Sequence, residues 1–176
     1  GRALIRVVDN GFGMSPTDAR MSFERHATSK ISKAEDLFAI TTMGFRGEAL
    51  ASIAAVAEVE LVTRRADDEL GTCINIAASK VKSQEPVAAA VGTNFKVRNL
   101  FFNIPARRKF LKSDKVEYKH IIDEIHRIVL TNPSVAFKVV FDNEIKYQLL
   151  PENIHQRIAN VFGKKLNQNL VPIGVE

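Results

Sequence analysis

Several short segments alternate apolar and polar residues, and this pattern limits the chain to folds that contain a half-buried β-sheet. In residues 93–99, Phe95 and Val97 fall on one side of an extended strand, and Val59 and Leu61 repeat the pattern earlier in the chain. Successive side chains of a strand point to opposite faces, so alternation is typical of a strand with one buried face. Further strands are expected at residues 4–8, 72–77, 81–84, 135–141 and 145–149.

Helices are expected between these strands, but without a regular alternation of strand and helix. Ser15 and Pro16 begin the first one, because serine is a favoured N-cap and proline suits the first helical position. This helix is expected to run to about residue 25. Residues 115–130 carry apolar side chains at helical spacing. Other helices are expected at residues 34–38, 48–56, from 105 and at 154–162. The mixture predicts an α+β fold with a largely antiparallel or mixed sheet.

Composition excludes several classes of protein. With 176 residues, of which 45% are hydrophobic, the chain can bury a core of its own. Cys73 is the single cysteine, so there is no internal disulfide framework and a reducing compartment is expected. No apolar run approaches the roughly 20 residues that a membrane helix needs. The net charge of +5 suggests an anionic partner without identifying it.

The first candidate site is the turn Asp9-Asn10-Gly11-Phe12-Gly13-Met14. Glycines in such a turn permit positive φ and close approach of the backbone to a ligand. Asp9, at the end of a strand, is placed to accept hydrogen bonds from an amino-bearing ligand. A tight turn with a capping aspartate is the alternative interpretation.

Three other segments could bind phosphate or a base. Gly44 and Gly47 bracket the entry to a helix, whose free N–H groups attract anions. Thr28, Ser29 and Lys30 offer two hydroxyls and an ammonium group, and Thr93 opens a strand with a hydroxyl. Each segment also has a purely structural alternative. Gly44 and Gly47 could belong to a packing loop, residues 28–30 to a solvated polar loop, and Thr93 could be an ordinary strand residue. No P-loop sequence occurs.

Taken in order, the motifs resemble the ATPase region of the MutL family of DNA mismatch-repair proteins. They read DNGFGM, RHATSK, GFRGEALASI, VGTNFKV and FFNIPARRKFLK. The match spans residues 2 to about 111 by its strong motifs and is expected to extend to the end of the chain. The motif RHATSK is more similar to the bacterial members of the family than to the eukaryotic ones. The resemblance implies a Bergerat-type ATP-binding fold, a two-layer sandwich in which helices cover one face of a mixed, mostly antiparallel sheet. It also implies ATP and Mg²⁺ as cofactors.

The resemblance also implies a role for each matching residue. Asp9 would accept a hydrogen bond from the adenine amino group, and Thr93 would reach the adenine through Asp9 or a water. Glu48 is expected mainly to serve helix capping and packing. The ATP-binding residues implied are Asp9, Gly11, Gly13, Met14, Thr28, Ser29, Lys30, Gly44, Phe45, Arg46, Gly47, Glu48, Ala49, Leu50 and Thr93.

The same resemblance places the catalytic residues outside this chain. In the family, a helix upstream of Asp9 supplies a glutamate that activates water and an asparagine that binds Mg²⁺. The chain is therefore expected to be truncated at its N-terminus and to hydrolyse no ATP by itself, and no metal site is expected within it. Its expected parts are an ATP-binding domain over residues 1–150, a linker helix over 151–168 and the first strand of a following domain over 169–176.

A basic segment predicts contact with DNA. Residues 107–119 include six basic and only two acidic residues. The DNA-binding candidates are Arg107, Arg108 and Lys112. For the full-length protein the family implies a homodimer, a mismatch-recognition protein and other repair proteins as partners, and a cytoplasmic location. For the basic segment, the alternative is a solvated charged face. For the whole chain, two alternatives remain: another member of the ATPase superfamily that contains MutL, such as a topoisomerase, and a basic nucleic-acid-binding module without nucleotide chemistry.

Overall fold

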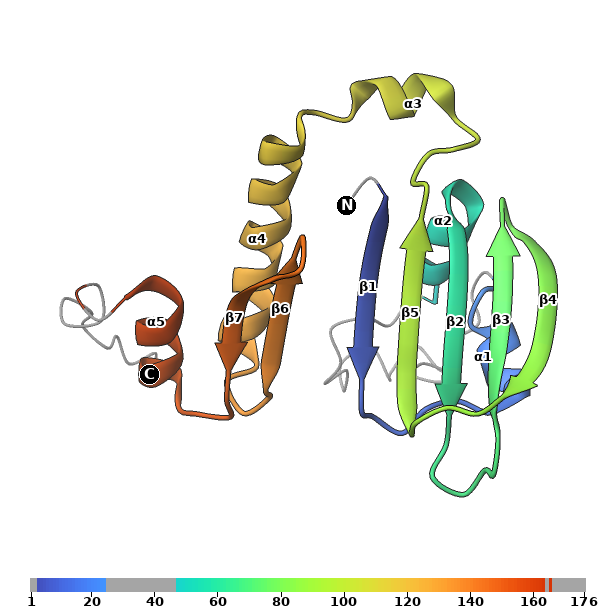
Figure 1. Ribbon diagram of the computed structural model, residues 1–176, viewed down its shortest axis with the longest axis horizontal. Helices are drawn as coiled ribbons and strands as arrows, with labels where there is room; N and C mark the ends of the chain where they lie inside the picture. The colour runs from blue at the N-terminus through green and yellow to red at the C-terminus, as the bar shows by residue number, and fades with distance from the viewer. Residues whose placement is uncertain (1–2, 25–46, 164, 166–176) are drawn as a thin grey trace, which may run out of the picture. The chain divides into compact units, whose positions relative to one another are not determined.

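The computed structural model describes residues 3–24, 47–163 and 165 (Figure 1). They form two compact units, the N-terminal unit Gly1–Lys112 and the C-terminal unit Ser113–Glu176. The helix expected at residues 34–38 and the strand expected at 169–176 lie outside the described residues. No helix in the described part of the chain combines the length and the apolar character that crossing a bilayer requires.

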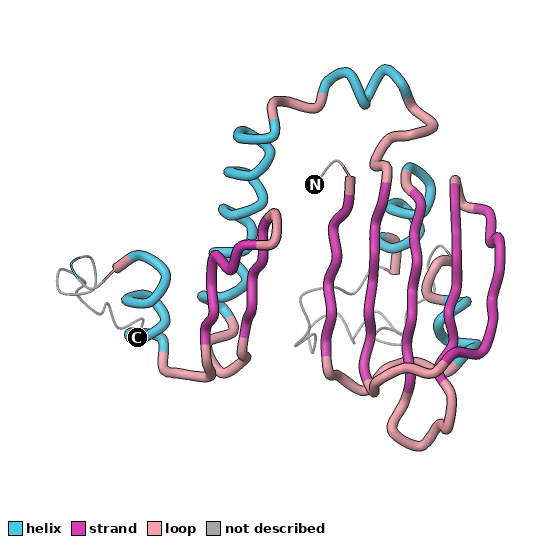
Figure 2. Tube along the Cα trace, viewed as in Figure 1, coloured by secondary structure: helices cyan, strands magenta, loops and turns pink. Residues whose placement is uncertain are grey.

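The N-terminal unit contains a five-stranded sheet in the order β1-β5-β2-β3-β4, in which every neighbouring pair is antiparallel (Figure 1). Figure 2 shows these strands side by side in magenta. All five strands that the sequence predicted in this unit are present, so the α+β fold with its mostly antiparallel sheet is confirmed. The strands are β1 (Leu4–Asp9), β2 (Glu58–Arg64), β3 (Gly71–Ala77), β4 (Lys80–Val87) and β5 (Gly92–Arg98).

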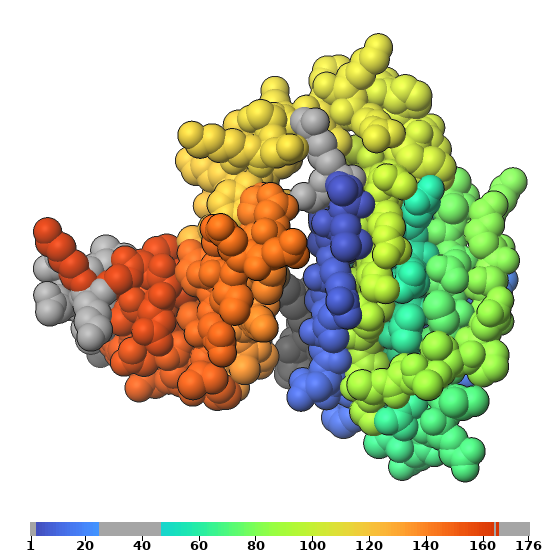
Figure 3. Space-filling view, in the orientation of Figure 1, coloured from blue at the N-terminus to red at the C-terminus, as the bar shows by residue number. Residues whose placement is uncertain are grey.

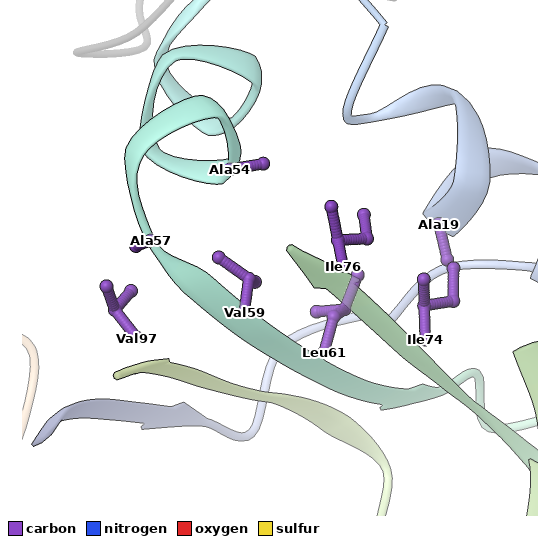
Figure 4. Packing of buried hydrophobic residues seen from close by; sticks show 8 residues of the cluster. All are labelled: Ala19, Ala54, Ala57, Val59, Leu61, Ile74, Ile76 and Val97. Atoms are coloured by element: carbon purple, nitrogen blue, oxygen red, sulfur yellow. The ribbon is translucent and has the colours of Figure 1, made fainter. Parts of the chain in front are cut away.

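Two helices cover one face of this sheet (Figure 1). They are α1 (Pro16–Met21) and α2 (Ala49–Val56), and both contact β3. Ser15 caps α1, since its hydroxyl oxygen accepts from the N–H of Asp18 at 3.1 Å. Figure 4 shows the small side chains of Ala19 and Ala54 facing the branched residues of the strands, which lets the helices lie close to the sheet. The core residues are Ala19, Ala54, Ala57, Val59, Leu61, Ile74, Ile76 and Val97.

The C-terminal end of α2 is anchored to two loops. The carbonyl of Ala54 accepts from the N–H of Ser79 at 2.9 Å, and that of Val56 accepts from the N–H of Phe101 at 2.7 Å. These carbonyls have no partner inside the helix, so the contacts hold α2 against the turns after β3 and β5. At the other end, Glu48 is the N-cap residue, but its side chain makes no capping hydrogen bond, and the capping role expected of it was wrong.

The C-terminal unit combines two helices with a hairpin. The strands β6 (Phe137–Phe141) and β7 (Glu144–Leu149) are joined by Asp142 and Asn143, whose positive φ angles of 46° and 67° are typical of a tight hairpin turn. The helices are α4 (Asp114–Thr131) and α5 (Ile154–Phe162). Helix α5 packs on α4 and β7, so residues 154–162 belong to this unit. The division of the chain lies after Lys112, not near residue 151 as the sequence had suggested.

Candidate functional site

A row of polar side chains crosses the end of the sheet. Asp9 of β1 pairs in register with Thr93 of β5, which pairs with Thr63 of β2, which pairs with Thr72 of β3. We call these four residues the polar row. Paired residues share a face, and Thr63 continues the buried face of Val59 and Leu61. The helix-covered face thus changes from apolar to polar at this end of the sheet.

Asp9 is fixed by the backbone around it. One carboxylate oxygen, Oδ1, accepts from the N–H of Gly11 at 2.9 Å and from the N–H of Thr93 at 3.2 Å. Within the described residues, the second oxygen takes no hydrogen bond. Strand β1 is exposed along its length, and it lies at the surface in Figure 3. The carboxylate is therefore oriented by the protein and still has an acceptor to offer a ligand.

Thr63 joins the turn after β1 to the start of β5. Its side chain is 1% exposed. The hydroxyl accepts from the N–H of Met14 at 3.0 Å, donates to the carbonyl of Gly92 at 3.0 Å and lies 3.2 Å from the hydroxyl of Thr93. Sequence reasoning missed this residue as part of the site. The available signal was a hydroxyl at a buried position of an alternating strand.

Two glycines let the backbone segments of the site meet. Gly13 has φ 67°, and a Cβ atom there would lie 2.0 Å from the carbonyl oxygen of Arg64. Gly92 has φ 112°, and its Cβ atom would lie 2.2 Å from the carbonyl oxygen of Asp9. Gly13 was predicted from the sequence as a site residue and Gly92 was not. Both positions require glycine, because any side chain would collide with backbone.

The structure brings only part of the predicted site together. Gly47, Glu48, Ala49 and Leu50 lie at the start of α2, where Gly47 has φ 66°. The predicted phosphate contacts Thr28, Ser29, Lys30, Gly44, Phe45 and Arg46 lie outside the described residues. The residues that meet around Thr63 and the turn are Asp9, Gly11, Gly13, Met14 and Thr93.

The opposite face of the sheet is occupied by ion pairs. Glu60 bonds to Lys96 and lies 3.4 Å from Arg98. The hydrogen bond from Lys96 holds the pKa of Glu60 below its ordinary value. Nearby on this face, burial raises the pKa of the Cys73 thiol, which makes it a poor nucleophile. The charges of Glu60, Lys96 and Arg98 are thus paired with one another, whereas Asp9 in the polar row keeps one carboxylate oxygen without a hydrogen bond among the described residues.

The described residues do not provide a metal site. No group of three or more histidine, cysteine, aspartate or glutamate side chains converges within the described ranges. Mg²⁺ prefers carboxylate oxygens, phosphates and waters. The residues present therefore do not form a Mg²⁺ site by themselves, and no chemical step through the metal follows from them.

A second candidate surface is the basic helix α3 (Pro105–Phe110). Arg107 and Arg108 are exposed on it, and Lys112 is exposed just after it. Within the described ranges, neither arginine side chain forms an ion pair. A purely structural role for these arginines would require ion pairs with carboxylates of the fold, and the described residues show none.

Comparison with known proteins gives clear relatives, although no protein-family model matches the chain. The DNA mismatch repair protein MutL of Porphyromonas gingivalis strain W83 is 56% identical over 176 residues, which are 100% of this chain and 28% of that protein. MutL of Bacteroides fragilis strain YCH46 is 59% identical over 175 residues, which are 99% of this chain and 28% of that protein.

Comparison with solved structures leads to the same family as comparison with sequences. The Aquifex aeolicus MutL ATPase domain complexed with ADP matches with a TM-score of 0.70 and 31% identity, covering 91% of this chain and 57% of that one. The N-terminal domain of a DNA repair protein matches in fold, with a TM-score of 0.74, 24% identity and coverage of 93% and 49%. The sheet, its helical layer and the turn after β1 thus define the fold of a mismatch-repair ATPase domain.

The chain belongs to the MutL family of DNA mismatch-repair proteins, and the matched relatives named here are bacterial. It spans 28% of the length of the curated relatives it matches. A topoisomerase-like member of the same superfamily is no longer a competing interpretation.

Proposed function

We propose that this segment forms the adenine-binding part of the ATP site in a mismatch-repair ATPase. The observation that carries the proposal is the state of Asp9, whose carboxylate is held by the N–H groups of Gly11 and Thr93 and keeps one oxygen for a ligand. An ionised carboxylate only accepts hydrogen bonds, and the adenine amino group only donates them. The ADP complex of a relative with the same fold supports a nucleotide as the ligand.

The phosphates would lie at the start of α2. Unpaired N–H groups and the helix dipole favour an anion there. We assign Thr28, Ser29, Lys30, Gly44, Phe45 and Arg46 to the same role on the sequence motifs alone. Mg²⁺ would accompany the phosphates and would be held by residues other than those described.

The complete protein would use ATP turnover as a switch. In our proposal, binding and hydrolysis of ATP drive homodimerisation and signalling to a mismatch-recognition protein and other repair proteins on DNA, in the cytoplasm. Support comes from the whole-chain similarity to proteins named for DNA mismatch repair.

The test is nucleotide affinity in the complete protein carrying Asp9→Asn. The amide oxygen can still accept from Gly11 and Thr93, so the turn keeps its shape, but the amide NH₂ then faces the ligand. A donor would meet the amino group of adenine. We expect ATP binding, measured by calorimetry, to weaken by about 1–3 kcal/mol, or roughly one to two decades of affinity.

Asp68→Asn is the matched control, because Asp68 pairs with Arg65 at 2.8 Å on the surface. It should leave ATP affinity unchanged. Equal affinity of Asp9→Asn and the unmodified protein would contradict the adenine role. Absence of nucleotide binding in the unmodified protein would favour the basic module without nucleotide chemistry.

We also propose that Arg107, Arg108 and Lys112 contact the DNA backbone. Exposed cations on a short helix suit phosphates, and such contacts are independent of sequence. In the complete protein, the triple alanine variant should bind duplex DNA more weakly at low salt. The slope of log affinity against log salt should fall by up to about 3, since each lost contact removes about 0.9.

Melting of the same variant separates this role from a structural one. A folded variant that keeps both its DNA affinity and its salt slope would contradict the proposal. A lower melting temperature with unchanged DNA binding would assign these cations to stability.

A further inference from the structure

We propose that Thr63 is a positioning residue that fixes the direction of the Thr93 hydroxyl and thereby makes the ligand-facing edge of the polar row acceptor-only. The inference rests on the proposed ATP site and deepens it, because it names what distinguishes adenine from a 6-oxopurine. Thr63 itself is buried and would not touch the nucleotide.

The hydrogen-bond inventory of Thr63 leads to this conclusion. A hydroxyl has one hydrogen and two lone pairs. The hydrogen of Thr63 goes to the carbonyl of Gly92 at 3.0 Å, and one lone pair takes the N–H of Met14 at 3.0 Å. The contact of 3.2 Å with the Thr93 hydroxyl then uses the second lone pair. Because the carbonyl of Gly92 can only accept, we assign the hydrogen of Thr63 to it, and the hydrogen in the contact with Thr93 then comes from Thr93.

Burial makes this arrangement hard to change. Thr63 is 1% exposed, so water cannot replace a partner that turns away. Thr93 is half-buried, and with its hydrogen committed to Thr63 it shows lone pairs outward. Asp9, its register partner in β1, adds the second oxygen of a carboxylate whose first oxygen is already used.

Two acceptors without a donor select a group that carries two hydrogens. The exocyclic amino group of adenine has two N–H bonds, whereas the 6-oxo group of hypoxanthine or guanine offers only lone pairs. A site built for a donor discriminates strongly against an analogue that lacks it, because its own acceptors are left unpaired. In the absence of Thr63, the Thr93 hydroxyl can rotate and donate to a 6-oxo group.

The experiment compares ATP with inosine triphosphate, its 6-oxo analogue, by calorimetry on the complete protein. The unmodified protein should prefer ATP, and Thr63→Val should reduce that preference about tenfold by weakening ATP and admitting the analogue. Thr63→Ser retains the hydroxyl and should retain the preference. Thr131→Val is the control, since the Thr131 hydroxyl lies in α4, outside the site, and donates to the carbonyl of Arg127 at 2.9 Å; the preference should not change.

A double variant shows whether Thr63 acts through Thr93. Thr63→Val combined with Thr93→Val should have the same preference as Thr93→Val alone, and additive losses would overturn the inference. If Thr63→Val does not fold, Thr93→Val decides, because it leaves the bonds of Thr63 to Met14 and Gly92 in place. Full preference for ATP in Thr93→Val would then overturn it.

The two proposals fail in different ways. An unmodified protein that binds neither nucleotide would contradict the ATP site itself. An unmodified protein that prefers ATP, together with a folded Thr63→Val that keeps the full preference, would overturn only the role of Thr63.

Discussion

Both compact units bury polar side chains, but they use them differently. In the C-terminal unit, Arg157 is 0% exposed, and its guanidinium bonds to Glu152 at 2.7 Å and to four backbone carbonyls. The carbonyls belong to Val129, Pro133, Val135 and Leu150. In the N-terminal unit, Thr63 is equally enclosed, yet its partners Thr93 and Asp9 reach the edge of the site.

The difference separates a structural polar group from a binding one. The donors of Arg157 are engaged by its own unit, so its burial stabilises one arrangement of α4, α5 and the hairpin. Asp9 accepts two hydrogen bonds from the backbone and retains an oxygen for something else. Unused hydrogen-bonding capacity on an oriented group, rather than burial alone, indicates a ligand site.

Replacing Arg157 should have the largest effect on stability. Arg157→Met removes the hydrogen bonds of the guanidinium to four carbonyls and to Glu152, and removing one member of a buried ion pair typically costs about 3–5 kcal/mol. Chemical denaturation of the complete protein, with hydrogen exchange of α4 and β7 as a local probe, measures this. Arg127→Met is the control, because Arg127 pairs with Glu124 on the surface, and it should cost less than about 1 kcal/mol. Equal effects would remove the distinction between the units.

The glycines provide the next comparison. Gly92→Ala adds a Cβ atom 2.2 Å from the carbonyl oxygen of Asp9, whereas Gly163→Ala, at φ 94°, meets nothing within 4 Å. Backbone strain alone costs about 1–3 kcal/mol in each. We expect Gly92→Ala to be the more destabilising and to abolish ATP binding, as measured by thermal melting and calorimetry. ATP affinity that survives in Gly92→Ala would show that the contact between β1 and β5 does not shape the site.

A smaller effect concerns the pH dependence of the ion pair at Glu60. Lys96 lowers the pKa of Glu60 in the folded state. The pair therefore contributes stability above the ordinary glutamate pKa of about 4.3, and loses it as the pH falls through the lower folded value. Glu60→Gln should lower the free energy of unfolding at pH 7 by no more than about 1 kcal/mol. The difference from the unmodified protein should vanish in acid.

The exposed pair of Glu144 and Lys146 is the counterpart in the C-terminal unit, at 2.6 Å. The hydrogen bond from Lys146 lowers the pKa of Glu144 as well. Because this pair lies on the surface, Glu144→Gln should change the pH dependence less than Glu60→Gln does. Urea denaturation over a series of acidic to neutral pH values compares the two, and a larger change for Glu144→Gln would reverse our ranking.

Much of the fold could be predicted from the sequence, because the residue pattern that specifies each helix or strand lies within that element. Alternation of apolar and polar residues located the strands, and helix α5 was predicted with its observed limits, Ile154–Phe162. Helix α1 ends at Met21, earlier than the expected residue 25, since Ser22 turns its hydroxyl back to the carbonyl of Ala19 at 2.8 Å. Such side-chain competition is hard to see in a pattern.

The site was predicted less completely, because its geometry depends on contacts far apart in the chain. Asp9, Gly13 and Thr93 stood out as motif residues. Thr63 did not, and Gly92 lay within a motif without being assigned to the site, since the importance of both arises from strand register, which brings β1, β5 and β2 together. Arg157 was missed for the same reason: a single arginine in an amphipathic helix gives no sign that it will meet four carbonyls.

The most direct test of the adenine site is a crystal structure of the complete protein with a non-hydrolysable ATP analogue. We predict that the adenine amino nitrogen lies about 2.7–3.2 Å from the Asp9 carboxylate oxygen that does not bond to Gly11 and Thr93. A nucleotide bound elsewhere, or an adenine whose amino group points away from Asp9 and Thr93, would contradict the account.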